Sequence, residues 1–244
     1  MSALDEQLAM MRHARDRGWD SLLTGQHYLN EGDNQQLQAV PLLARLATEA
    51  GEMTLGLGIL LLNLHNPVYT AETVASLDII ARGNFIFGVG LGYRDIEFDA
   101  FGVPKGERSK QFEEYLTLVQ RLWTEDRVSY TGPGCRLDNV HMNIRSKPRP
   151  PLWMAANNDP ALKRAASMAD TWFVNPHATL DRAREHAPHL GRAPARAAPS
   201  VATHHRVSAE PVGGPCRSPR SRRSFCLQRS DAGHDASGRD PSCI

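Results

Sequence analysis

The stretch that decides the fold is TLGLGILLLNL, residues 54–64. It is apolar at both alternating sets of positions, which is typical of a strand whose sheet is covered on both faces. Pro67 then begins a helical pattern of apolar residues, and NFIFGVGLG, residues 84–92, is a second apolar strand. A strand, a helix and another strand in this order predict a parallel pair, because parallel strands need a crossover connection.

The same alternation continues on both sides of this unit. Five strands separated by helices indicate a mostly parallel α/β sheet, either open or closed into a barrel. The alternation of helices and strands is interrupted at about 127–150. Together with a turn at Pro133-Gly134, this interruption predicts a hairpin insertion. The remaining expected helices are 2–18, 40–50, 107–124 and 161–169, and the remaining expected strands are 21–27, 152–156 and 171–174.

The last part of the chain differs in composition from the rest. Residues 186–244 are rich in Arg, Ala, Ser and Pro, contain no lysine and show no apolar period. We therefore expect residues 1–185 to form one partial domain and residues 186–244 to form a tail that does not pack. Such a tail is either a disordered appendage or sequence read out of frame, and the abrupt end of the pattern favours the second.

Composition excludes several classes of function. With 28 Lys+Arg against 27 Asp+Glu, the net charge of +1 gives no electrostatic reason to expect nucleic acid or an acidic membrane as a partner. No apolar stretch reaches the ~20 residues of a spanning helix, and no secretory signal is visible, so a cytoplasmic protein is expected. The four cysteines have no CxxC spacing, so we expect neither disulfides nor a metal site.

Functional side chains of parallel α/β proteins lie at the carboxyl ends of the strands. There, Gln26 and His27 follow the first expected strand. His27 is either a hydrogen-bonded structural residue or a proton donor or acceptor. Gly58 in the second strand either marks a bulge or lets a flat ligand approach the backbone. In the third strand Gly90 leaves room for close packing, with Tyr93 and Arg94 at its mouth.

Two further motifs bear on ligand binding. Asn157 and Asn158 open a helix whose free N–H groups suit a phosphate, although an ordinary helix cap would look the same. The run from Gly88 to Gly92 lacks the third glycine of a dinucleotide fingerprint, so we reject a Rossmann site. Acidic residues before and at the start of the 107–124 helix are expected in a solvated loop and helix start; these are Glu97, Asp99 and Glu107.

Several segments, in order and at compatible spacing, resemble the bacterial-luciferase-like flavin monooxygenases. The likeness covers about residues 3–180. The segments that carry it are GWDS from Gly18 followed by Gln26-His27, LLLNLHNPV at 60–68, GNFIFGVGLGYR at 83–94, EFDAFG at 97–102, Leu122-Trp123, VSYTG at 128–132, KPRPP at 147–151 and DTW at 170–172.

This resemblance implies a (β/α)8 TIM-barrel fold, here incomplete because the first strand and the last strands are missing. It implies reduced FMN with oxygen as the chemistry, or in a related branch the deazaflavin F420. His27 would handle protons beside the flavin ring, with Gln26 where many members carry an acid. Gly58-Ile59 would form a cis peptide against the ring. Gly90 and Leu91 would lie near the cofactor, Leu91 at a position that is basic in some members, and Ala156, Asn157 and Asn158 would hold the phosphate.

The resemblance thus predicts a flavin-dependent monooxygenase that oxygenates a small organic substrate, with reduced FMN supplied by a flavin reductase. A sibling interpretation is F420-dependent hydride transfer without oxygen. A third is a truncated, non-catalytic remnant, which the composition of the tail favours. The family commonly forms dimers, so a homodimer is expected. The identity of the substrate is not readable, because the specificity loops fall largely in the missing half.

Overall fold

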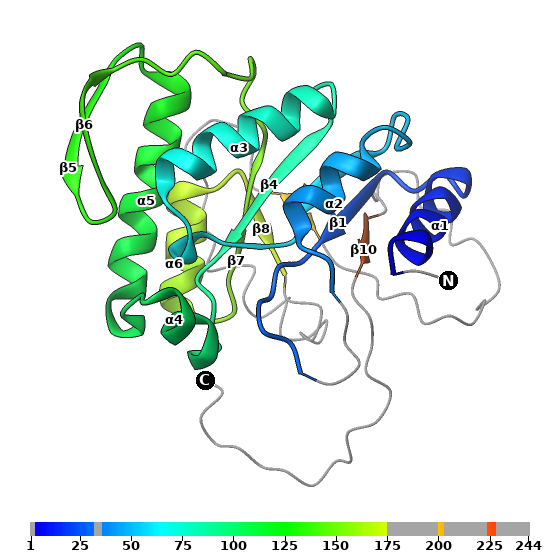
Figure 1. Cartoon of the computed structure of the whole chain (residues 1–244), viewed down its shortest axis with the longest axis horizontal. Helices are drawn as coiled ribbons and strands as arrows, with labels where there is room; N and C mark the ends of the chain where they lie inside the picture. The colour runs from blue at the N-terminus through cyan, green and yellow to red at the C-terminus, as the bar shows by residue number, and fades with distance from the viewer. Residues whose placement is uncertain (1–2, 32–35, 175–199, 203–223, 228–244) are drawn as a thin grey trace, which may run out of the picture.

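The computed structural model describes residues 3–31, 36–174, 200–202 and 224–227 (Figure 1). Its helices are α1 (Ala3–Asp16), α2 (Ala39–Leu46), α3 (Pro67–Ile80), α4 (Asp95–Phe101), α5 (Arg108–Thr124) and α6 (Asp159–Met168), with 3-10 turns η1 (Leu62–Leu64) and η2 (Lys105–Glu107). Its strands are β1 (Ser21–Thr24), β2 (Thr54–Leu57), β3 (Leu60–Leu61), β4 (Phe85–Gly90), β5 (Val128–Gly132), β6 (Cys135–Val140), β7 (Leu152–Ala155), β8 (Thr171–Phe173), β9 (Ser200–Ala202) and β10 (Ser224–Leu227).

One parallel sheet organises the chain. Its strands follow the order β10, β1, β2, β4, β7, β8 and β9, and β3 also pairs with β4. Each neighbouring pair is parallel, so the prediction of a mostly parallel α/β sheet is confirmed. Within the described residues the path ends at β10 and β9 and does not close into a ring, as expected for an incomplete barrel.

The two ends of the sheet are formed by strands from the region expected to be a tail. β9 pairs with β8, and β10 pairs with β1, residue Ser21 opposite Ser224. Both pairings use backbone groups that an open sheet edge would leave unpaired. Apart from these two strands, the expectation of an unpacked tail at 186–244 lies outside the described residues.

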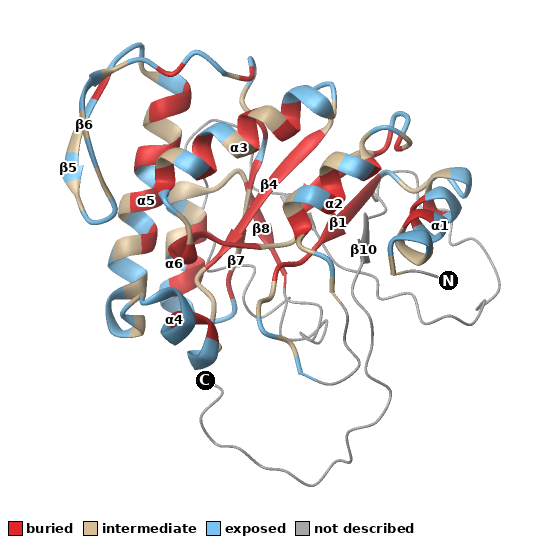
Figure 2. Cartoon of the chain, in the orientation of Figure 1, coloured by how far each residue is buried: buried red, intermediate tan, exposed pale blue. Residues whose placement is uncertain are grey.

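The two faces of the sheet differ because side chains alternate along each strand. On β4, Phe85 and Phe87 belong to the large core under the helices, whereas Ile86 belongs to a smaller inner cluster with Leu23 and Phe173. Strands β1 and β4 are buried along their whole length, which Figure 2 shows in red. This double coverage explains why the strands are apolar at both sets of positions.

The hairpin insertion and helix α4 lie outside the regular alternation of strands and helices. β5 and β6 form the expected antiparallel hairpin, which projects beside α5 (Figure 1). Helix α4 differs from the expectation, which places Glu97 and Asp99 in a solvated loop. It ends at Gly102, whose left-handed conformation (φ +65°) favours glycine. α4 lies at the end of the sheet where β4 ends, and so it borders the candidate site.

Candidate functional site

The ends of β1 and β2 are in direct contact. The backbone N–H of Gln26 donates to the carbonyl of Ile59 at 3.2 Å. The peptide bond between Gly58 and Ile59 is cis, as the resemblance implied. A Cβ on Gly25 would lie 3.2 Å from the carbonyl oxygen of Gly58, so the two chain segments pass closely. The expected strand at 54–64 is divided into β2, β3 and η1, and the break between β2 and β3 lies at Gly58 and Ile59.

Gln26 braces this contact with its side chain. The residue is buried, and its Oε1 accepts the backbone N–H of Leu61 at 3.1 Å. Nε2 of His65 lies 3.0 Å from the same oxygen, and Nε2 of Gln26 donates to the hydroxyl of Tyr28 at 2.9 Å. A glutamine can donate and accept at once, whereas the acid expected from the family could only accept when ionised.

Burial keeps the groups around Gln26 uncharged. It lowers the pKa of His65 to about 4 and raises the pKa of Tyr28 to about 12, the latter with help from nearby Tyr69 and Glu97. Because Oε1 of Gln26 is an acceptor, Nε2 of His65 carries a proton there. Tyr28 also packs against Phe101 of α4, with ring centroids 4.6 Å apart.

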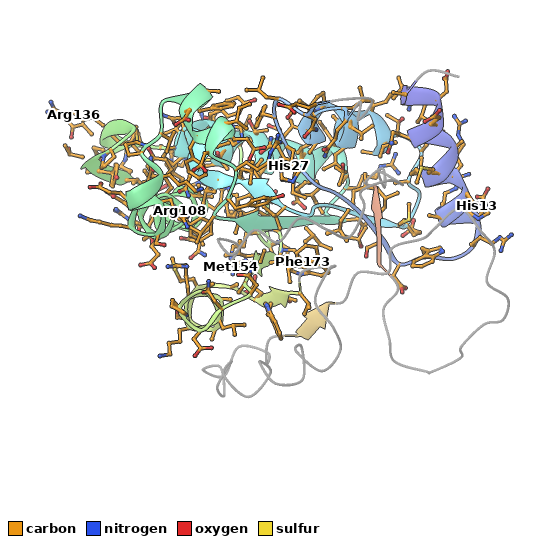
Figure 3. All side chains as sticks on the ribbon, turned by 90° about the horizontal axis from the view of Figure 1, so that it is seen from below. His13, His27, Arg108, Arg136, Met154 and Phe173 are labelled. Carbon is orange, nitrogen blue, oxygen red and sulfur yellow. The ribbon has the colours of Figure 1, made fainter. Side chains whose placement is uncertain are left out.

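His27 is held by a carboxylate from a distant part of the chain. Its Nδ1 lies 3.0 Å from Oε1 of Glu97. The same oxygen accepts the backbone N–H of Tyr28 at 2.9 Å and Nη1 of Arg94 at 3.2 Å. Glu97 is 0% exposed, while the His27 side chain is 20% exposed. Figure 3 shows His27 in the middle of the molecule, between the labelled Arg136 of the hairpin and His13 of α1.

The expectation that Glu97 lies in a solvated loop is wrong. Residues 95–101 form a helix, and α4 buries Glu97 and Phe98 while Asp99 stays exposed. Phe98 packs in a cluster with Leu61 and Leu64, which fixes the orientation of the helix. For Asp99 and Glu107 the expectation of exposure holds.

Arg94 fixes the loop after β1. Its Nη1 donates to the carbonyl of Tyr28 at 2.9 Å and to Oδ1 of Asn30 at 3.0 Å. Its Nη2 donates to the carbonyl of Leu29 at 3.1 Å. Leu29 has a φ of +52°, a left-handed conformation that is rare for a leucine and persists only where the surroundings impose it. Arg94 and Glu97 provide those surroundings.

Gly90 and Leu91, at the end of β4, differ in what they face. A Cβ on Gly90 would lie 2.6 Å from Cδ1 of Ile59, so the missing side chain makes room for Ile59. Ile59 is itself partly buried against the inner cluster. Leu91 packs against the core under the helices, and its carbonyl accepts Nδ2 of Asn63 at 3.1 Å. A basic group, present here in some family members, is replaced by an apolar one.

The end of β7 has a simpler construction. Oδ1 of Asn158 accepts the backbone N–H of Ala161 at 3.0 Å, which makes Asn158 the N-cap of α6. Ala156 is buried, and its carbonyl accepts Nε1 of Trp172 at 2.9 Å, while Asn157 is exposed. The structure thus shows the helix cap, and a phosphate role for these residues stays a prediction.

Sequence reasoning placed Gln26, His27, Gly58 and Ile59 together, and the structure brings them together. It missed the buried carboxylate of Glu97 and the link from His65 to Gln26. The signal for the first was the spacing of Arg94 and Glu97, which are three residues apart at the N-cap and in the first turn of α4, followed by Phe98. That pattern is short, and a solvated loop carries the same residue types.

Across the described residues, no three His, Cys, Asp or Glu side chains gather where they could hold a metal ion. Within the same part of the chain, every helix is too short or too polar to span a bilayer.

Comparison with known proteins places this geometry in context. A profile of the family described as luciferase-like monooxygenase matches residues 1–212. An uncharacterized protein of Sinorhizobium fredii (strain NBRC 101917 / NGR234) is 28% identical over 161 residues, 64% of this chain and 45% of that protein. An F420-dependent glucose-6-phosphate dehydrogenase of Kineococcus radiotolerans is 26% identical over 174 residues, 69% of this chain and 51% of that protein. The chain thus spans about half the length of these curated relatives.

Two solved structures share the fold. One is the oxygenating constituent of 3,6-diketocamphane monooxygenase from Pseudomonas putida, a type II Baeyer–Villiger monooxygenase in complex with FMN; the TM-score is 0.72 at 17% identity, covering 84% of this chain and 63% of that chain. The other is an F420-dependent secondary alcohol dehydrogenase in complex with an F420-acetone adduct; the TM-score is 0.71 at 19% identity, covering 83% and 65%. At these identities the likeness is one of fold.

Proposed function

The chain belongs to the luciferase-like monooxygenase family, and from this premise we propose that it is a flavin-dependent oxidoreductase using reduced FMN and oxygen on a small organic substrate. The observation that carries the proposal is the imidazole of His27, which a buried carboxylate holds in place. His27 follows β1, is fixed through Nδ1 by the buried Glu97, and is next to Gln26, which contacts Ile59. Such an imidazole can exchange a proton with a reacting group beside it.

The residues at this end of the sheet fit a flat, largely apolar ring. Ile59, Trp153 and Ala155 are partly exposed on the inner face of the sheet. A ring placed there would cover apolar surface and lie near His27. We propose that the cofactor is held by Gln26, His27, Gly58, Ile59, Gly90 and Leu91 around the ring, and by Ala156, Asn157 and Asn158 at the phosphate.

In this assignment the protein positions groups and moves protons. When bound, the reduced flavin supplies the electrons for the reaction with oxygen. His27 accepts or donates a proton at Nε2, the ring nitrogen that Glu97 leaves available. Gln26 holds the Ile59 and Leu61 backbone in place from two sides, through its N–H and its Oε1. General acid–base groups contribute typically about 10²–10⁴-fold to a rate.

The test is oxygen uptake with reduced FMN in the purified full chain. We expect His27→Ala to lower turnover about 10²-fold while the Kd for FMN changes less than about threefold, because the imidazole supplies proton transfer rather than ring binding. His13→Ala, an exposed histidine on α1, is the matched control and should behave like the unmodified chain. Unchanged turnover in His27→Ala would exclude a role of His27 in the reaction.

A second candidate is F420-dependent hydride transfer, favoured by the F420-dependent dehydrogenase among the sequence relatives. Loss of the F420 absorbance on adding substrate, without oxygen uptake, would identify it. A chain that binds neither FMN nor F420 and melts without cooperativity would instead be a non-catalytic remnant. The FMN assignment implies a flavin reductase as partner, and the family implies a homodimer; both stay predictions.

A further inference from the structure

We propose that Glu97 is a positioning residue that fixes the tautomer of His27, so that the neutral imidazole carries its proton on Nδ1 and presents Nε2 to the site. The functional meaning of this tautomer rests on the proposed function, since it concerns the proton that His27 exchanges with cofactor or substrate. The tautomer itself rests only on the contacts around Glu97.

The other partners of Glu97 set the direction of its hydrogen bond to His27. Oε1 of Glu97 faces three groups, of which the backbone N–H of Tyr28 and Nη1 of Arg94 can only donate. The oxygen is therefore an acceptor. Nδ1 of His27, 3.0 Å away, satisfies it only as N–H, because an unprotonated Nδ1 would set two lone pairs against each other. A neutral ring with its proton on Nδ1 has its lone pair on Nε2.

The carboxylate of Glu97 cannot easily turn away from His27. It is 0% exposed and belongs to a helix that Phe98 anchors against Leu61 and Leu64. Arg94, one turn earlier, is tied to the carbonyls of Tyr28 and Leu29. Rotating the carboxylate would break contacts to His27, Tyr28 and Arg94 together, so it constrains the imidazole rather than following it.

The backbone and the ring of His27 are held by further contacts. Nε2 of Gln38 donates to the backbone carbonyl of His27 at 3.0 Å, and the Tyr93 ring meets the imidazole edge to face at 5.9 Å. Among the described residues, no hydrogen bond involves Nε2 of His27. The nitrogen that remains for chemistry is thus the one opposite Glu97. When it accepts a proton, the carboxylate stabilises the resulting imidazolium.

The second carboxylate oxygen of Glu97 distinguishes orientation of His27 from simple stabilisation of the fold. This oxygen, Oε2, is buried and has no hydrogen-bond partner among the described residues. A buried acceptor without a partner costs free energy, and such groups are rare in native proteins unless another role retains them. Orienting His27 is a role that needs the carboxylate and that an apolar residue of similar size could not perform.

The test is the position of the imidazole proton, read from the ¹⁵N chemical shifts of the full chain labelled at histidine and assigned with His27→Gln. At about pH 8 we expect the neutral imidazole of His27 in the unmodified protein to carry its proton on Nδ1. Glu97→Gln keeps the shape, but its amide can donate as well as accept, so the Nε2–H fraction should rise at least about fivefold. Asp99→Asn removes the same charge from an exposed site on the same helix and should change nothing.

Two results would overturn the proposal: Nε2–H in the unmodified protein, or an unchanged tautomer ratio in Glu97→Gln. The first needs no variant, so it decides even if Glu97→Gln does not fold. Turnover provides a second readout, with kcat of Glu97→Gln expected to fall about tenfold and KM to stay within about twofold. Since the tautomer is read without cofactor, a chain that binds neither FMN nor F420 would refute the proposed function and leave the tautomer result standing.

Discussion

The end of β1 and the end of β7 were both predicted to hold a cofactor, yet they are built in different ways. At β1, His27 is held by Glu97, 70 positions further along the chain, and the carboxylate is buried. At β7, Asn158 caps the backbone of Ala161, three positions away, and both Asn157 and Asn158 are exposed. The first region depends on tertiary packing and the second on local chain geometry. Substitutions in the first region should therefore change the free energy of unfolding more, and affect more distant residues, than substitutions in the second.

We expect the largest loss of stability from a substitution at the end of β1. Glu97→Ala removes the acceptor of His27, Tyr28 and Arg94 in a buried place, which should lower the free energy of unfolding by about 4 kcal/mol. Denaturant unfolding of the full chain measures it. Asp99→Ala, exposed on the same helix, should stay within about 0.5 kcal/mol. A loss below about 1 kcal/mol for Glu97→Ala would mean that the cluster is not a buried unit.

The second effect is a pH dependence that the β7 end should lack. In the fold the pKa of His65 is about 4, whereas an unfolded chain has about 6.5. As the pH falls, the unfolded chain binds the proton first, so the free energy of unfolding is full above about pH 7 and declines toward pH 4, by on the order of 3 kcal/mol. His65→Gln should flatten this slope. An identical slope in the variant and the unmodified chain would contradict the burial of a neutral imidazole.

The third effect concerns the close contact between β4 and Ile59. Gly90→Ala would place a Cβ 2.6 Å from Cδ1 and 3.1 Å from Cγ1 of Ile59, so the side chain must shift. We expect a loss of about 2 kcal/mol in the free energy of unfolding, as for overpacked cores. Gly106→Ala has open space around its Cβ and should cost less than about 0.5 kcal/mol. Equal effects in the two variants would show that Ile59 moves without cost.

The smallest effect tests whether the β7 end is only a cap. Asn158→Ala should lower the free energy of unfolding by about 1 kcal/mol, the usual size for an N-cap. Asn157→Ala, exposed beside it, should change less than about 0.5 kcal/mol. Neither variant should alter the tautomer of His27. If Asn158→Ala also weakened FMN binding well beyond its effect on stability, the predicted phosphate role would gain support.

The fold and part of the site could be predicted from the sequence because both depend on patterns that are local or repeated. Residues 54–64 are apolar at both alternating sets of positions, and this pattern predicts a strand covered on both faces. The position of His27 at the end of β1 follows from the same element order. Helix α4 was missed because seven residues rich in acids resemble a loop in the sequence. The packing of Phe98 against the cluster below stabilises them as a helix.

Apart from α4, the sequence by itself therefore determined the alternation of helices and strands, the double coverage of the sheet and the residues gathered at the carboxyl ends of its strands. Only the tertiary structure decided which of those residues act on one another. Periodicity records whether a position faces the core, but it carries no information about which distant segment faces it there. The burial of Glu97 against His27 is such a pairing, because a carboxylate looks the same in the sequence whether water or an imidazole lies beside it.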